Sequence, residues 1–135
     1  MHWSIDRVVA DRWAGVLCDE DEIQTPTLDD VLRLIAALDA KTHTMVTLFG
    51  SDNSYLCIGG GSGRYVVYAS TPDEQLWNLL LDSDDRKGMV LLNAGGQEGD
   101  FPVRQVLDKS HVLHAARTFF ETGALDAALR WEKQI

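Results

Sequence analysis

A glycine-rich stretch flanked by two segments that favour β-structure constrains this 135-residue chain more than any other feature. It runs from Ser54 to Ser70 with the sequence SYLCIGGGSGRYVVYAS. The aromatic, β-branched and other apolar residues on both sides favour a pleated, packed surface. The glycines permit the positive φ that a tight turn or a bulge needs. The stretch therefore predicts a β-hairpin around which the rest of the chain is organised.

The same glycines do not make a phosphate-binding motif. The dinucleotide pattern G-x-G-x-x-G would need a glycine at Tyr65 or Val66, and a Walker-type loop would need lysine where Arg64 follows Gly63. A strand, not a helix, is expected after the glycines, so the helix N-terminus that binds phosphate is missing. We therefore expect these glycines to have a structural role.

Length and composition predict one domain over residues 1–135. The chain is long enough to bury a core, and 45% of it is hydrophobic. No apolar run approaches the length that spans a bilayer, and the N-terminus lacks the pattern of a signal peptide. We therefore expect a cytoplasmic protein. Cys18 and Cys57 form no C-x-x-C pair, and both are expected to be buried thiols.

The net charge restricts the possible partners. Lys and Arg total 12 and Asp and Glu total 21, which gives a formal net charge of −9. A chain this acidic repels nucleic acid and anionic membranes, so neither is expected as a partner. A basic protein surface would be attracted to it. The alternative is that the charge only maintains solubility.

Two helices are expected. Thr27 is the predicted N-cap of the first, whose apolar stripe recurs at helical spacing. The second begins near Ser110, covers residues 111–121 and ends at Gly123. Each helix has one apolar stripe, so each needs one sheet face. The prediction is an α+β fold with a mostly antiparallel sheet and both helices packed on one face, as a single pair of layers.

The remaining chain is divided between strands and loops. Strands are expected over residues 2–11, 42–49 and 89–93, with an extended segment over 101–107, and residues 76–81 are ambiguous between a strand and a short helix. Residues 13–17 are expected to continue the first strand after a bend. Residues 18–22 and 95–100 are expected to be loops. In the tail, Leu125, Leu129 and Trp131 are expected to dock on the domain, with a structural role for Trp131.

Catalytic and metal-binding motifs are not found in the sequence. His111 and His114 are three residues apart, but no H-E-x-x-H motif accompanies them. The zinc deaminase signature, the G-x-S-x-G elbow and a complete calcium loop are also absent. No metal, no cofactor and no enzymatic activity are expected. A hydrolase using Cys57 or a histidine remains a rival hypothesis.

A series of motifs in the second part of the chain resembles a known family. They are LCIGG at 56–60 with RYVVY at 64–68, NAGG at 93–96, FP at 101–102, AARTFFETG at 115–123, and LRWE at 129–132. Their order and spacing resemble the Imm1 family of bacterial immunity proteins, from about Thr27 to Glu132. The N-terminal strand and residues 18–22 lie outside this resemblance.

The resemblance implies a protein that binds another protein and is not an enzyme. Such proteins are encoded beside polymorphic toxins and cover the active site of the cognate toxin in the producing cell. Members resemble partners of DNA cytidine-deaminase toxins, among other types. The resemblance is compatible with a monomer or a weak homo-oligomer. The alternative is a small-molecule-binding or regulatory α+β domain, with its ligand at the glycine hairpin.

The expected toxin-binding residues are acidic or aromatic side chains in loops, because loops carry recognition on a rigid scaffold. They are preferred to residues 19–22, which lie outside the resemblance. The candidates are Asp73, Glu74, Trp77, Asp82, Asp84, Asp85, Glu98 and Asp100.

Overall fold

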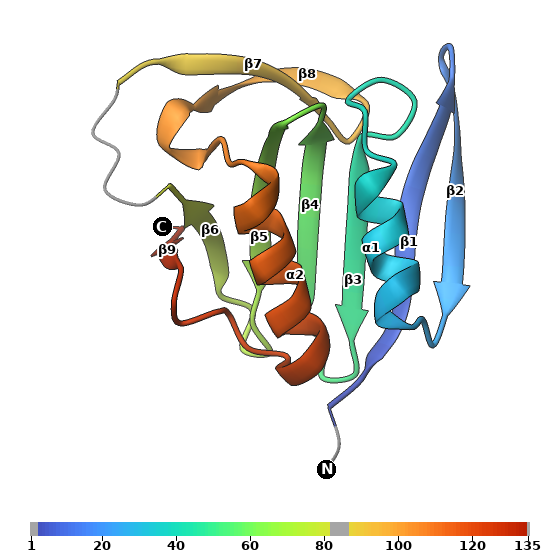
Figure 1. Cartoon of the computed structure of the whole chain (residues 1–135), viewed down its shortest axis with the longest axis vertical. Coiled ribbons are helices and arrows are strands. Elements are labelled where there is room, and N and C mark those ends of the chain that lie inside the picture. The colour runs from blue at the N-terminus through green and yellow to red at the C-terminus, as the bar shows by residue number, and fades with distance from the viewer. Residues whose placement is uncertain (1–2, 82–86, 135) are drawn as a thin grey trace.

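The computed structural model describes residues 3–81 and 87–134 of the chain. Over these residues the strands are β1 Ile5–Ala14, β2 Leu17–Gln24, β3 Met45–Gly50, β4 Tyr55–Gly61, β5 Arg64–Ser70, β6 Leu76–Leu80, β7 Met89–Ala94, β8 Gln97–Pro102 and β9 Arg130–Lys133 (Figure 1). The helices are α1 Leu28–Ala36, the 3-10 helix η1 Val103–Gln105 and α2 Lys109–Thr122. Seven strands form one sheet in the order β2-β1-β3-β4-β5-β6-β9, and β7 and β8 form a second. All neighbouring strands pair antiparallel. The predicted antiparallel α+β fold is therefore confirmed.

The glycine hairpin lies at the centre of the large sheet, as β4 and β5. The register runs from Tyr55 paired with Ser70 to Gly61 paired with Arg64. Ser62 and Gly63 form the turn with φ of 55° and 90°. Two positive φ values match the twist that two-residue hairpins require. The hairpin predicted from the sequence is confirmed.

The glycines of β4 make room for other segments of the chain. A Cβ atom on Gly59 would lie 2.6 Å from the Cβ of Ala94 in β7, and one on Gly61 would lie 2.5 Å from the backbone N of Ala40. Gly59 and Gly61 are both buried. The close neighbours leave no space for a ligand at Gly59 and Gly61 themselves. A hollow of about 220 Å³ lies against Val66, Val67 and Tyr68 of β5, so a ligand site at the glycine hairpin stays a prediction.

The two α-helices have well-defined ends. Thr27 caps α1 as predicted, because its hydroxyl accepts from Asp30 N while the Asp30 carboxylate accepts from Thr27 N. In α2 the cap is Asp108 and not Ser110, because the Asp108 carboxylate accepts from His111 N at 2.9 Å. Gly123 ends α2 in the left-handed conformation, as predicted. Among the described residues, no helix is long and apolar enough to cross a bilayer.

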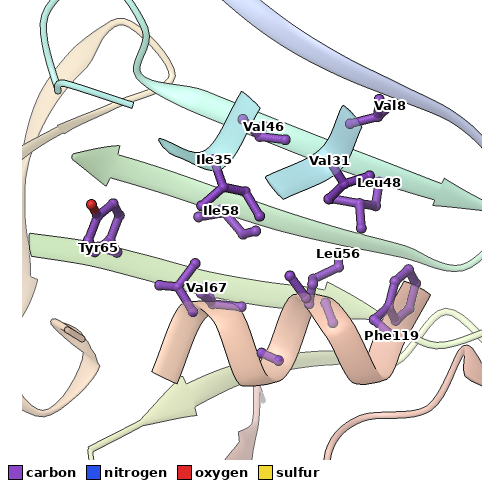
Figure 2. Packing of buried hydrophobic residues seen from close by; sticks show 14 of the residues in the cluster. Val8, Val31, Ile35, Val46, Leu48, Leu56, Ile58, Tyr65, Val67 and Phe119 are labelled. Carbon is purple, nitrogen blue, oxygen red and sulfur yellow. The ribbon is translucent and has the colours of Figure 1, made fainter. Parts of the chain in front are cut away.

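The hydrophobic core lies where the two helices meet the large sheet. Both helices are in front of this sheet in Figure 1, and their apolar side chains join one buried cluster (Figure 2). Ile35 of α1 and Phe119 of α2 are fully buried with Leu56 of β4. Alternate strand residues reach the same cluster because successive side chains point to opposite faces of a sheet. The other strand residues of Figure 2 are Val8, Val46, Leu48, Ile58, Tyr65 and Val67.

The first quarter of the chain differs from the prediction. Gly15 and Val16 form a turn, so Leu17 begins a new strand and does not continue the first one. Residues 18–22 are part of β2 and not a loop. The main chain of β2 pairs with β1 along its whole length, from Arg7 with Gln24 to Ala14 with Leu17. An edge strand with two solvated faces does not need the apolar alternation on which the prediction depended.

The second half contains two further differences. Residues 95–100 were expected to be a loop, but Gly95 and Gly96 form a turn and β8 begins at Gln97. The extended segment expected over residues 101–107 is also wrong, because β8 ends at Pro102 and η1 follows. The short turn was missed because adjacent glycines in a sequence also indicate a longer loop. Here Gly95 and Gly96, with φ of 72° and 84°, form a tight turn between two strands.

The ambiguous segment and the tail both join the large sheet. Leu76–Leu80 is the strand β6, and β9 pairs with it in the register Leu79 with Trp131. The predicted docking of the tail is thus confirmed. Trp131 packs against the core and donates from Nε1 to the Asp126 carbonyl at 3.1 Å. Its ring is only half-buried, so its truncation would cost less than that of a fully buried tryptophan.

Candidate interaction surface

The acidic and aromatic residues predicted to bind a partner do not form one cluster. Asp73 and Glu74 are exposed in the turn between β5 and β6. Trp77 lies in β6, half-buried, with its backbone paired to Ala69 and Lys133. The other predicted residues of this part of the chain, Asp82, Asp84 and Asp85, lie outside the described residues.

Glu98 and Asp100 are in a different place, on β8. They pair with Asn93 and Leu91 of β7, so these four side chains share one face of the small sheet. Leu91 is 60% exposed, which shows that this is the outer face. The β5–β6 turn and the β7–β8 hairpin lie at opposite ends of the large sheet (Figure 1). The predicted set is therefore split between two separate surfaces.

The β1–β2 hairpin carries a second exposed surface, which the sequence prediction missed. Val16 and Leu17 at its tip are 92% and 72% exposed. Behind them β2 carries four successive carboxylates, from Asp19 to Glu22. The signal in the sequence was the same acidic run, but its assignment to a loop concealed that it lies on a regular strand beside an apolar tip.

The tips of the two hairpins border shared hollows. One, of about 240 Å³, is lined by residues of both hairpins and by Lys41. A larger one, of about 370 Å³, lies between β2, β3 and the β7–β8 turn, with Trp13, Glu20, Met45 and Gly95 in its walls. The lining residues that join the hairpins in the smaller hollow are Trp13, Gly15, Val16, Asn93 and Gly96.

A half-buried polar network holds the two hairpins together. The Asp11 carboxylate of β1 accepts from Thr44 N at 2.7 Å, Met45 N at 3.0 Å and the indole N–H of Trp13 at 2.8 Å. The Thr44 hydroxyl donates to Asp11 and accepts from Gly96 N at 2.9 Å. The Trp13 ring also lies so close to Gly96 that a Cβ there would be 2.0 Å from it. The β7–β8 turn is therefore fixed beside the β1–β2 hairpin.

We call the exposed outer residues of these two hairpins the two-hairpin surface, which comprises Val16, Leu17, Asp19, Glu20, Met89, Leu91, Glu98 and Asp100. In the described part of the chain, the large hydrophobic residues that are exposed are Val16, Leu17, Met89 and Leu91, and all four belong to it. Apolar side chains bordered by charges are the usual anatomy of a protein-binding surface. The two-hairpin surface is therefore the candidate site for a protein partner.

Cys57 does not have the surroundings of a catalytic nucleophile. Its thiol is buried on the sheet face opposite the core, 3.4 Å from the Thr47 hydroxyl. Burial raises the pKa of Cys57 and also that of its neighbour Tyr68. A thiolate is therefore disfavoured. Cys18 was expected to be buried as well, but it is exposed, because β2 is an edge strand.

Neither histidine of α2 belongs to a metal-binding cluster among the described residues. His111 Nδ1 is 2.7 Å from the Asp108 carboxylate, and the hydrogen bond from the His111 backbone N–H is the main cause that lowers the pKa of Asp108. His114 lines an open hollow of about 300 Å³ with His111 and Asp126. No cluster of three or more His, Cys, Asp or Glu residues able to hold a metal ion occurs within residues 3–81 and 87–134.

Comparison with known proteins assigns the family. No curated protein matches the chain. A family model described as immunity protein Imm1 matches residues 19–133. The match begins in β2, so the acidic residues 19–22 lie inside the family region, and the expectation that they lie outside it was wrong. Because the family model covers most of the chain, including both α-helices, most of β2 and every strand after it, this protein belongs to the Imm1 family of immunity proteins.

Proposed function

We propose that this protein binds a cognate bacterial toxin through the two-hairpin surface and neutralises it by covering the toxin's active site. The observation that carries the proposal is the location of the exposed hydrophobic residues. Val16 and Leu17 are exposed at the tip of one hairpin, Met89 and Leu91 are exposed on the outer face of the other, and both hairpins also carry acidic side chains. Burying these side chains against a partner would remove apolar area from water. In this proposal the function of the protein is to bind the toxin, so it depends on the contact between the two-hairpin surface and the toxin.

The proposed partner is a basic domain that acts on nucleic acid, of the deaminase type. A toxin that binds DNA needs a positively charged cleft to contact phosphates. The chain's net charge of −9 would attract such a cleft, and part of this charge lies on the two hairpins. Opposite fields speed association and discriminate between partners. An acidic surface seated in the cleft would occupy the place of the substrate.

The remaining properties follow from this role. In this proposal the protein works without a cofactor or metal, as a monomer or a weak homo-oligomer. It acts in the cytoplasm, where the toxin is made. The rate of capture matters in that setting because a small amount of free toxin damages the cell. Asp73, Glu74 and Trp77 are assigned no contact in this proposal, because they lie outside the two-hairpin surface, and Asp82, Asp84 and Asp85 lie outside the described residues.

The test is co-expression with the toxin domain encoded by the neighbouring reading frame, combined with association rates at low and high salt. The double variant Glu98→Gln/Asp100→Asn removes two charges from the two-hairpin surface. We expect it to slow association by about tenfold at low salt, since rim charges act mainly on the association rate. Asp73→Asn/Glu74→Gln is the matched control, because it removes two exposed charges at the other end of the sheet.

The outcomes separate the function from its location. Absence of protection and of binding by the unaltered protein would overturn the immunity function. Protection with equal association rates for both double variants, insensitive to salt, would overturn the acidic two-hairpin surface. Slower association only for the Asp73 and Glu74 variant would place the contact at the β5–β6 turn instead.

A further inference from the structure

We propose that the partner toxin adds a strand of its own, rich in Lys or Arg, to the free edge of β2. This inference rests on the proposed function and specifies how the partner is recognised. In strand addition the main-chain hydrogen bonds give affinity, and the side chains of the two edge strands give specificity. The structure provides an unpaired edge, a regular backbone and a charge pattern that selects the added strand.

Within the described residues, one side of the β2 main chain has no neighbouring strand. β2 is the first strand in the order of the large sheet, and β1 is its neighbour in the described part of the chain. Thr25 N donates to the Asp6 carbonyl at 2.8 Å, which continues the β1–β2 ladder. In an antiparallel pair alternate residues exchange these bonds. Thr25 therefore faces β1, and the even-numbered residues of β2 direct their N–H and C=O groups to the free edge, namely Cys18, Glu20, Glu22 and Gln24.

This edge lacks most of the features that prevent strand addition. Natural edge strands are often short, bulged or interrupted by proline. β2 has eight residues, its register with β1 is continuous, and its sequence LCDEDEIQ contains no proline. The other free edge of the sheet is different, because β9 has only four residues. β2 is therefore the longer template.

The charges of β2 determine which strand can add. Arg7 and Arg12 of β1 form exposed ion pairs with Glu22 and Asp21, both at 3.2 Å. Asp19 and Glu20 have no ion pair within the described residues, and they point to opposite faces of the sheet. A second copy of β2 would place acidic residues against acidic residues and be repelled. A strand with basic side chains on both faces would meet Asp19 on one face and Glu20 on the other.

The experiment measures both edge hydrogen bonds and affinity, with a catalytically inactive form of the toxin domain from the neighbouring reading frame. Amide exchange is followed by NMR for the free protein and for the complex. We expect the amides of Cys18, Glu20 and Glu22 to become protected in the complex, whereas side-chain docking alone would not protect them. The Asp21 amide, which faces β1, is the internal control.

Glu20→Pro tests the edge directly, because proline removes an edge-facing N–H and is tolerated on edge strands. We expect its affinity for the toxin to fall about tenfold or more, the equivalent of at least one hydrogen bond. Glu20→Gln separates the loss of charge from the loss of the N–H. Lys133→Pro is the matched control on the opposite edge, where Gln134 N donates to Leu76 O, so that Lys133 faces outward.

Four outcomes decide the inference. Edge protection together with weaker binding by Glu20→Pro, but not by Lys133→Pro, supports strand addition. Unchanged exchange and equal binding by Glu20→Pro would overturn it while leaving the immunity function in place. If Glu20→Pro unfolds, the exchange measurement on the unaltered protein decides alone. Absence of toxin binding by the unaltered protein would overturn the proposed function and this inference together.

Discussion

Two hairpins of this molecule have the same short connection and opposite surroundings. The β1–β2 hairpin turns at Gly15 and Val16, and the β4–β5 hairpin turns at Ser62 and Gly63. Every residue of β4 except Tyr55 is buried, whereas every residue of β2 is exposed or half-buried. The geometry of the turn therefore does not determine whether a hairpin is buried or exposed. The position of the hairpin in the strand order determines this, because the central hairpin has neighbouring strands on both edges and the terminal hairpin does not.

The difference also explains the composition of the two hairpins. β4 contains glycines where the β7–β8 hairpin and the loop after α1 approach it closely. β2 contains carboxylates, which are compatible with water on both faces and repel acidic strands at the edge. The central hairpin thus holds the fold together, and the terminal hairpin is free to contact a partner.

The largest expected effect comes from truncating one leucine in each hairpin. Leu56 is fully buried in the core, and Leu17 is 72% exposed at the hairpin tip. Leu56→Ala should lower the free energy of unfolding by about 2–5 kcal/mol. Leu17→Ala should change it by less than about 0.5 kcal/mol. Urea unfolding of both variants measures this, and similar losses for the two would mean that the β1–β2 tip is packed in solution.

A smaller effect is expected from adding one methyl group to a glycine of each hairpin. Gly61 has φ of 145°, and its Cβ would lie 2.5 Å from the Ala40 backbone, whereas Gly15 has φ of 63° and open space around it. Gly61→Ala should cost about 2–4 kcal/mol from strain and overpacking. Gly15→Ala should cost about 1 kcal/mol from strain alone. Thermal unfolding of the two variants compares them, and an equal cost would show that close packing at Gly61 is unimportant.

The smallest effect concerns the loop that covers the end of the central hairpin. Burial of Asp39 works to raise its pKa, but hydrogen bonds from the backbone N–H of His43, Lys41 and Thr42 and from the Thr42 hydroxyl outweigh it. The net pKa lies well below the ordinary value of 3.8. A depressed pKa contributes stability above about pH 4, and this contribution is lost as the pH falls below that value.

Asp39→Asn removes the carboxylate and therefore tests this contribution. The difference in unfolding free energy between the unaltered protein and Asp39→Asn should be largest near neutral pH and should shrink as the pH falls from about 4. Asp73→Asn, in the exposed β5–β6 turn, is the control. A difference that stays constant down to pH 2 would show that the Asp39 carboxylate does not stabilise this loop through its charge.

The parts of the fold that were predictable depend on local signals. The β4–β5 hairpin followed from glycines between β-favouring segments, and α1 followed from Thr27 and an apolar stripe. The assignment of β2 and β8 failed for a common reason. Neither strand has the alternation of apolar and polar residues that one buried face produces, because their burial is low on both sides. Only pairing with β1 and β7 makes them strands.

The candidate surface was predictable only in part. Glu98 and Asp100 were predicted from their acidity, but their neighbours Met89 and Leu91 were assigned to a strand with no indication that they are exposed. The exposure of Met89 and Leu91 depends on which face of the small sheet packs on Gly59 and Gly60. This packing brings Leu92 and Ala94 of β7 against glycines about thirty positions earlier in the chain.

The sequence by itself determined the antiparallel α+β class, the start of the first helix and the end of the second, the acidity and the Imm1 resemblance. These properties reside in composition, in short periodic patterns and in motif order, which do not depend on how distant segments meet. The tertiary structure alone decided that β2 has β1 as its one neighbour among the described strands, that the β4 glycines are contact points and that the β7–β8 turn lies beside the β1–β2 hairpin. Each of these depends on strand order and on packing between distant segments, and no local pattern specifies which strand is left without a neighbour.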